Sequence, residues 1–175
     1  MVPVALDGQR LGLVELLERA AEIGARHGVG IVDHIEDRVV GLKVRDIYEV
    51  PAAAIVLTAH AELERLVGTI HQNQLKPMLD QRWAYLVYAG LWLEPLRTDL
   101  DAYMDAVNEQ VTGKIGLKLY KGSARVVTRS SPNAVYDPQL ATFESGGLFS
   151  QAASPGFIEL WSLQSRMAWR MRDRG

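Results

Sequence analysis

The chain has 175 residues, enough for one ordinary domain with a sizeable core, and 48% of them are apolar against 23% charged. Its net charge of −2, from 19 basic and 21 acidic residues, provides no electrostatic footprint for a nucleic acid, so none is expected as a partner. Cysteine is absent, which excludes disulfides, thiolate metal ligands and a cysteine nucleophile and fits a reducing cytosol.

Three elements are predicted in the first quarter of the chain. Residues 2 to 6 are mostly apolar and run into a turn dipeptide, which predicts a short strand, and they lack the features of a signal peptide. Apolar positions at helical spacing predict an amphipathic helix over residues 13 to 27, ended by Gly28. Residues 29 to 42 are rich in β-branched side chains and predict a longer strand.

The two faces of that strand differ. One face carries Ile31, Ile35 and Val39, interrupted by two aspartates. The opposite face mixes apolar and polar side chains: Val32, His34, Glu36, Arg38 and Val40. Such a mixture suits the wall of a polar pocket, and a solvated sheet face explains it at least as well.

Three consecutive helices follow, and none of the chain's apolar runs approaches membrane-spanning length. The first is predicted over residues 51 to 67, the second after Pro77 and the third from Pro95. Residues 115 to 129 then predict a β-hairpin that turns at Lys121-Gly122.

The last part of the chain begins with a loop. Residues 130 to 156 hold three of the seven prolines and many small polar residues, which predicts a long ordered loop. Residues 157 to 174 predict a helix whose apolar side chains cover about 240° of its circumference, more than twice the ~100° needed to lie on one core. The order of elements indicates an α+β fold, with a small antiparallel sheet and hairpin packed with several helices, plus a C-terminal helix.

Local motifs do not name a reaction. Ser145-Gly146-Gly147 lacks the downstream Lys-Ser/Thr of a phosphate-binding loop, so a surface loop is the better interpretation. His34 and Glu36 face the same way on a strand while Asp37 does not, so no metal site is expected. No nucleophile elbow is present, and the basic residues of the hairpin, Lys118, Lys121, Arg125 and Arg129, need no anion to explain them.

One long stretch and several shorter ones carry a family resemblance. The long stretch is Gly28-Val29-Gly30-Ile31-Val32-Asp33-His34-Ile35-Glu36-Asp37-Arg38-Val39-Val40-Gly41-Leu42-Lys43, continuing through Arg45-Asp46-Ile47-Tyr48-Glu49 to Pro51-Ala52. The shorter ones are Leu86-Val87-Tyr88, Gly90-Leu91-Trp92, Lys118-Leu119-Tyr120-Lys121-Gly122-Ser123-Ala124, Arg129-Ser130-Ser131-Pro132, Ala134-Val135-Tyr136-Asp137 and Gly156-Phe157-Ile158. In this order they resemble argininosuccinate synthases over nearly the whole chain.

The resemblance implies the C-terminal part of a cytoplasmic, homotetrameric ligase of arginine biosynthesis. In that family, ATP activates the ureido oxygen of citrulline as an adenylate with loss of pyrophosphate, and the amino group of aspartate then displaces AMP. ATP and Mg²⁺ are expected on a preceding nucleotide-binding half, so this chain alone is expected to be inactive and to bind no cofactor.

Site residues are carried over on the matching positions. Glu36 and Tyr48 fall where the family contacts citrulline, so the carboxylate is expected to pair with the α-ammonium and the phenol to hydrogen-bond the same polar end. Both roles are positioning roles, and no catalytic residue is expected on this chain. The chain departs from the family pattern at Ile31, where arginine is frequent, and at Val44, where serine is frequent.

The expected organisation is a substrate-binding domain over residues 1–154 and an oligomerisation helix over residues 155–175. Two alternatives remain open. One is a stand-alone domain that binds citrulline or another amino acid, or only assembles, without ligase chemistry. The other is an α+β interaction module whose polar strand face is simply solvated.

Overall fold

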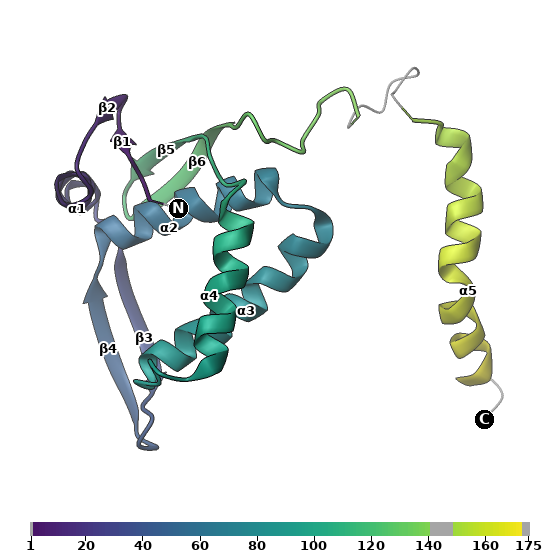
Figure 1. Cartoon of the computed structure of the whole chain (residues 1–175), viewed down its shortest axis with the longest axis horizontal. Coiled ribbons are helices and arrows are strands. Elements are labelled where there is room, and N and C mark those ends of the chain that lie inside the picture. Colours follow the sequence, from purple (N-terminus) through teal and green to yellow (C-terminus); the bar gives the residue numbers. More distant parts are fainter. Residues whose placement is uncertain (1, 141–148, 173–175) are drawn as a thin grey trace. The chain divides into compact units, whose positions relative to one another are not determined.

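The computed structural model describes residues 2–140 and 149–172 and shows the predicted α+β fold (Figure 1). The chain forms two compact units, Met1–Val135 and Tyr136–Gly175. The part of the chain that is described has three separate two-stranded antiparallel sheets and five α-helices. No helix in these described ranges is long and apolar enough to cross a membrane.

The described residues of the first unit form six strands and four α-helices. Its strands are β1 (Ala5–Leu6), β2 (Gln9–Arg10), β3 (Ile31–Asp37), β4 (Lys43–Glu49), β5 (Lys114–Tyr120) and β6 (Ser123–Ser130). Its helices are α1 (Leu13–Arg26), α2 (Pro51–Val67), α3 (Ile70–Tyr88) and α4 (Pro95–Asn108). The predicted helices over 13–27 and 51–67, and the hairpin over 115–129, are confirmed within one or two residues.

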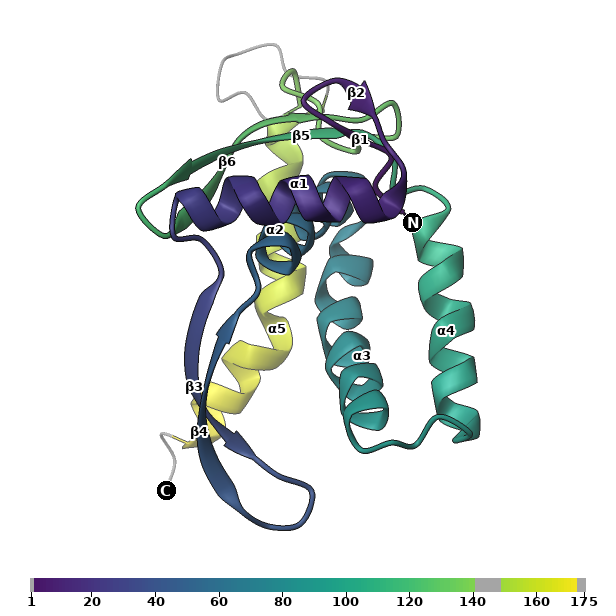
Figure 2. The same cartoon turned by 90° about the vertical axis from the view of Figure 1, so that its left-hand side faces the viewer.

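Helix α2 is the centre of the core, because it packs against α1 on one side and against the β5–β6 hairpin on the other. Ala20, Val29 and Ile55 form the first buried cluster, where α1 and α2 meet. Leu63, Val67 and Val111 form the second, near the end of α2. The β3–β4 hairpin extends away from these layers, as both views show (Figure 2).

Gly30 explains how β3 leaves the core at the start of α2. Its φ of +89° lies in the left-handed region, which favours glycine. A Cβ atom placed there would lie 2.6 Å from the backbone of Pro51, so a side chain has no room. Gly30 and Pro51 therefore fix where the β3–β4 hairpin joins the helical layer, and this local geometry sets the direction of β3.

The helix predicted after Pro77 begins earlier than expected. It starts at Ile70, because Thr69 and Gln72 form a capping box, and Pro77 lies inside it. Proline removes one backbone hydrogen bond. Next to it, Lys76 is buried and ion-pairs with Asp80 at 2.7 Å and with Glu64 of α2 at 2.8 Å, which holds this half of α3 in place.

The other half of α3 lies beside α4, as Figures 1 and 2 both show. The indole Nε1 of Trp83 donates a hydrogen bond to Asp101 at 2.7 Å, and Leu86 and Leu100 are buried. The C-terminal turn of α3 is therefore anchored on the side away from solvent. Tyr88 is the last residue of this helix.

The second unit contains a short 3-10 helix, η1 (Gln151–Ala153), and the helix α5 (Ser154–Arg172). The helix predicted from residue 157 thus begins three residues earlier. None of its described residues is buried, and its large apolar side chains are exposed: Phe157, Ile158, Leu160, Trp161, Leu163, Met167, Trp169 and Met171.

Candidate functional site

The β3–β4 hairpin carries the candidate site. Its register places Glu36 opposite Val44 and His34 opposite Asp46. The strand predicted over 29–42 was too long, because β3 ends at Asp37 and the chain turns before Gly41, whose φ is +85°. The prediction also missed β4, whose residues 43–49 mix charged with apolar and aromatic side chains without regular alternation.

Alternation along the two strands places four polar side chains on one face: His34, Glu36, Asp46 and Tyr48. The predicted sharing of a face by His34 and Glu36 is confirmed, and Val40 is excluded from it because it lies in the turn. The opposite face is crossed by the ion pair of Arg45 with Asp33, at 2.5 Å.

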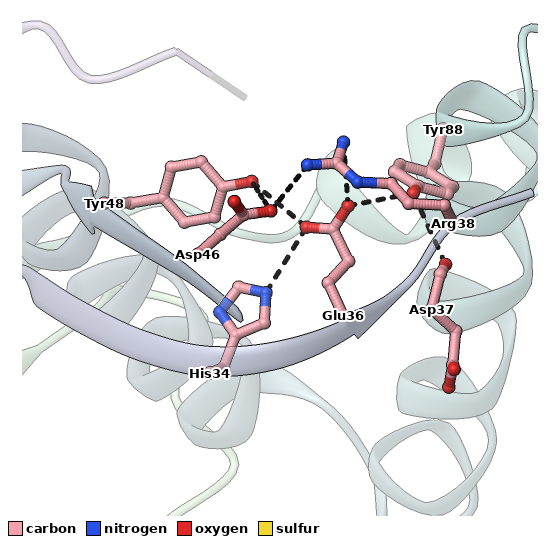
Figure 3. A network of polar contacts seen from close by, with 7 residues as sticks. All are labelled: His34, Glu36, Asp37, Arg38, Asp46, Tyr48 and Tyr88. Carbon is pink, nitrogen blue, oxygen red and sulfur yellow. Dashed lines mark hydrogen bonds and ion pairs between the residues drawn. The ribbon is translucent and has the colours of Figure 1, made fainter. Parts of the chain in front are cut away.

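The carboxylate of Glu36 is the centre of this network (Figure 3). The Tyr48 hydroxyl donates to Oε2 at 3.0 Å, and His34 Nε2 lies 3.4 Å from the same oxygen. Arg38 Nη1 lies 3.1 Å from Oε1, and the same guanidinium contacts Asp46 at 2.6 Å. The side chain of Glu36 is only 16% exposed, so these groups replace much of its hydration.

Tyr88 approaches the same carboxylate from α3. Its hydroxyl donates to Oε1 at 2.9 Å and lies 3.4 Å from the backbone oxygen of Asp37 (Figure 3). The two oxygens of Glu36 therefore each receive one tyrosine hydroxyl. Tyr88 links the exposed hairpin to the helical layer across 52 positions of sequence.

These contacts keep Glu36 ionised. The hydrogen bond from Tyr88 is the largest cause that lowers the pKa of this carboxyl below its usual value, followed by Tyr48 and the charge of Arg38. In turn, the hydrogen bond to Glu36 raises the pKa of both tyrosines. At neutral pH the network thus holds a carboxylate anion and neutral phenols, a combination that suits an ammonium group and not a general base.

An open recess lies beside the carboxylate. It has a volume of about 560 Å³ and is lined by Glu36, Asp37, Arg38 and Val39 at the end of β3 and by Ala84, Tyr85 and Tyr88 of α3. This space is large enough for an amino acid. Glu36 and Tyr88 form hydrogen-bonding groups in its wall.

The remaining sequence predictions have different outcomes. Among the described residues, no three His, Cys, Asp or Glu side chains gather as a metal site would require. The Ser145-Gly146-Gly147 motif lies outside the described residues. Arg129 of the basic hairpin pairs with Glu62 of α2 at 2.5 Å, which is a structural contact between β6 and α2.

The structure brings Glu36 and Tyr48 together, and their assignment to citrulline stays a prediction. Sequence reasoning did not connect Tyr88 or Asp46 with them. Tyr88 stood in one of the family-like motifs, which was the available signal. Of the two departures from the family pattern, Val44 lies directly opposite Glu36, whereas Ile31 lies on the other face of the hairpin.

Comparison with known proteins gives a consistent result. The family described as Arginosuccinate synthase C-terminal domain matches residues 1–168. The chain is 46% identical over 170 residues to the argininosuccinate synthase of Pyrococcus furiosus and 49% identical over 165 residues to that of Rubrobacter xylanophilus. It is 45% identical over 173 residues to the argininosuccinate synthase of Methanocaldococcus jannaschii.

Coverage of the two sides of each comparison is unequal. These matches take in 97%, 94% and 99% of this chain, respectively. They take in only 42%, 40% and 43% of the three relatives. The chain therefore spans less than half the length of the curated relatives that it matches.

Proposed function

The chain belongs to the argininosuccinate synthase family, and we propose that it supplies the citrulline-holding carboxylate to the ATP-dependent joining of citrulline and aspartate. In this proposal the whole enzyme is a cytoplasmic, homotetrameric ligase of arginine biosynthesis. ATP and Mg²⁺ are held by the part of the relatives' length that this chain does not match.

The observation that carries the proposal is the state of Glu36. Its carboxylate is mostly shielded from water, is kept ionised by its neighbours and borders an open recess. Such an anion suits the α-ammonium of an amino acid, because a charge-assisted hydrogen bond is stronger than a neutral one. The Tyr48 hydroxyl, 3.0 Å away, adds a donor or acceptor for the same end of the ligand.

The chemical contribution is positioning. Holding the backbone end of citrulline fixes where its ureido oxygen lies, which lowers the entropic barrier to attack on the activating nucleotide. ATP, when bound, supplies the adenylate leaving group. Glu36 and Tyr48 move no proton in this scheme, consistent with a carboxylate and a phenol that both keep their charge state at neutral pH.

Assembly is the second role that we propose for this chain. The exposed apolar side chains of α5 include Trp161 at 78% and Trp169 at 65% exposure. Exposed apolar area of this size is unfavourable in water and commonly marks an interface. A second copy of the chain is the proposed partner, in keeping with the homotetramer implied by the family resemblance.

Glu36→Gln tests the substrate role. In a complete enzyme that contains this segment, the substitution is expected to raise the KM for citrulline and to leave the KM for ATP unchanged, because one charge partner of the ammonium is lost. Glu49→Gln is the matched control, since Glu49 is an exposed glutamate at the end of β4 in the same hairpin. A raised KM for ATP with an unchanged KM for citrulline would contradict the assignment.

A stand-alone amino-acid-binding or assembly domain is the alternative. An amino-acid-binding domain predicts citrulline-dependent shifts in the NMR spectrum of this chain, and an assembly domain predicts self-association alone. In both cases, adding the nucleotide-binding part of a relative should not stimulate pyrophosphate release. The ligase proposal predicts that the mixture releases pyrophosphate. The open recess beside Glu36 is common to both amino-acid-binding proposals.

A further inference from the structure

The partners of Glu36 come from two different parts of the fold. His34, Arg38 and Tyr48 belong to the β3–β4 hairpin or its turn, so they move together with Glu36. Tyr88 belongs to α3, and its hydroxyl crosses from the helical layer to the hairpin. Only a contact of the second kind fixes the carboxylate relative to the rest of the unit.

The helix end that carries Tyr88 is well anchored. Leu86, two residues earlier, is 1% exposed. The backbone N–H groups of Ala89 and Leu91 donate to the carbonyls of Tyr85 and Leu86, which closes the helix just after Tyr88. The tyrosine is therefore a firm point of attachment for a hairpin that otherwise extends away from the core.

Tyr48 is a less firm partner. Its hydroxyl has one proton and lies near two acceptors, Glu36 at 3.0 Å and Asp46 at 3.3 Å, both on the hairpin. It is able to transfer its hydrogen bond to Asp46 or to a ligand without leaving the site. Tyr88 has its second acceptor in the backbone of Asp37, next to Glu36, so either bond ties α3 to the end of β3.

We propose that Tyr88 is a positioning residue that holds the Glu36 carboxylate at the recess between the hairpin and α3. This inference rests on the proposed function, because Glu36 is taken as the partner of the substrate ammonium. Tyr88 acts through Glu36: it fixes the direction of the carboxylate and favours its anion, so that the ligand meets an acceptor already in place. Pre-organisation of this kind lowers the cost of binding.

Tyr88→Phe is the test, because it removes the hydroxyl and keeps the ring. In the whole chain, the ¹³C NMR titration of the Glu36 side-chain carboxyl, assigned with Glu36→Gln, should move to a higher pKa. The dissociation constant for citrulline, from NMR shift titration, should rise about three- to tenfold, as expected for loss of one hydrogen bond. Tyr120→Phe, which alters an exposed tyrosine at the end of β5, is the control and should change neither value.

A second variant leaves Tyr88 itself intact. Glu36→Gln should lower the pKa of the Tyr88 phenol, since the hydrogen bond to the carboxylate is the largest cause of its raised value. In the Glu36→Gln background, Tyr88→Phe should weaken citrulline binding little further, because both changes remove one interaction. A purely structural role for Tyr88 predicts an additive loss instead.

The outcomes separate the two proposals. Citrulline binding that depends on Glu36, with a Glu36 titration unmoved by Tyr88→Phe, overturns the positioning role and leaves the proposed function standing. Citrulline binding that is independent of Glu36 overturns the proposed function. In that case, the two NMR titrations still decide whether Tyr88 holds the carboxylate, and unmoved values refute it.

Discussion

Trp161→Ala tests the assembly role of α5, because this indole is 78% exposed. Among the described residues, its one aromatic stacking partner is Phe157 of the same helix, with the ring centroids 5.5 Å apart. Burial of a tryptophan removes about 150–250 Å² from water, so a second copy that covers the exposed part would bury about 150 Å². At ~25 cal/mol per Å² this is worth about 4 kcal/mol per subunit before association costs are counted.

Loss of that area should weaken each contact by about 2–4 kcal/mol, which is roughly 30- to 1000-fold in the dissociation constant. Sedimentation velocity over a concentration series measures the change. Trp92→Ala is the matched control, because Trp92 is 56% exposed and lies between α3 and α4. It should leave the assembly intact. Folding of α5 itself should survive, since alanine favours a helix and Trp161 is not part of a core.

Two results would refute this reasoning. One is an intact chain that stays monomeric at every concentration, since α5 would then tolerate its exposed side chains without a partner. The other is a Trp161→Ala variant with the same mass distribution as the unchanged chain. Loss of assembly in the Trp92→Ala control as well would show that the effect of Trp161→Ala is not specific to α5.

Three further predictions concern chemistry, stability and pH. The chain alone should form no argininosuccinate from ATP, citrulline and aspartate, because its sequence has no complete phosphate-binding loop; citrulline-dependent pyrophosphate release would contradict this. Leu86→Ala should lower the free energy of unfolding, measured by urea titration, by about 2–5 kcal/mol, because this buried side chain is only 1% exposed. A loss below about 1 kcal/mol would show that the end of α3 is loosely packed. Citrulline affinity should stay level as the pH falls to 4.5, the usual pKa of a glutamate, and decline only below it. The reason is that the pKa of Glu36 is lowered in the folded protein, so its contribution to binding is lost only as the pH falls through that lower value. A decline that NMR titration detects at pH 4.5 or above would argue against an ionised Glu36 held by its neighbours.

Local signals predicted most of the secondary structure. The helices α1, α2 and α4 and the β5–β6 hairpin depend on apolar spacing, first-turn prolines and a turn dipeptide, all of which act over a few residues. The hairpin turns at Lys121 and Gly122, as the dipeptide predicted, and both residues take positive φ there. The early start of α3 was also a local signal, since Thr69 and Gln72 are three residues apart, but the predicted helix began only after Pro77.

The candidate site was only partly within reach of the sequence. Alternation along a strand placed His34 and Glu36 on one face, and the family resemblance singled out Glu36 and Tyr48. Nothing in the spacing indicated that Tyr88 would reach Glu36, because that contact depends on where α3 ends relative to an extended hairpin. Such a position is set by the packing of α3 and by the close approach of Gly30 to Pro51. The sequence by itself therefore determined most of the elements and the chemical groups, while the tertiary structure decided which of those groups meet, because contacts across 52 positions follow from packing and not from local periodicity.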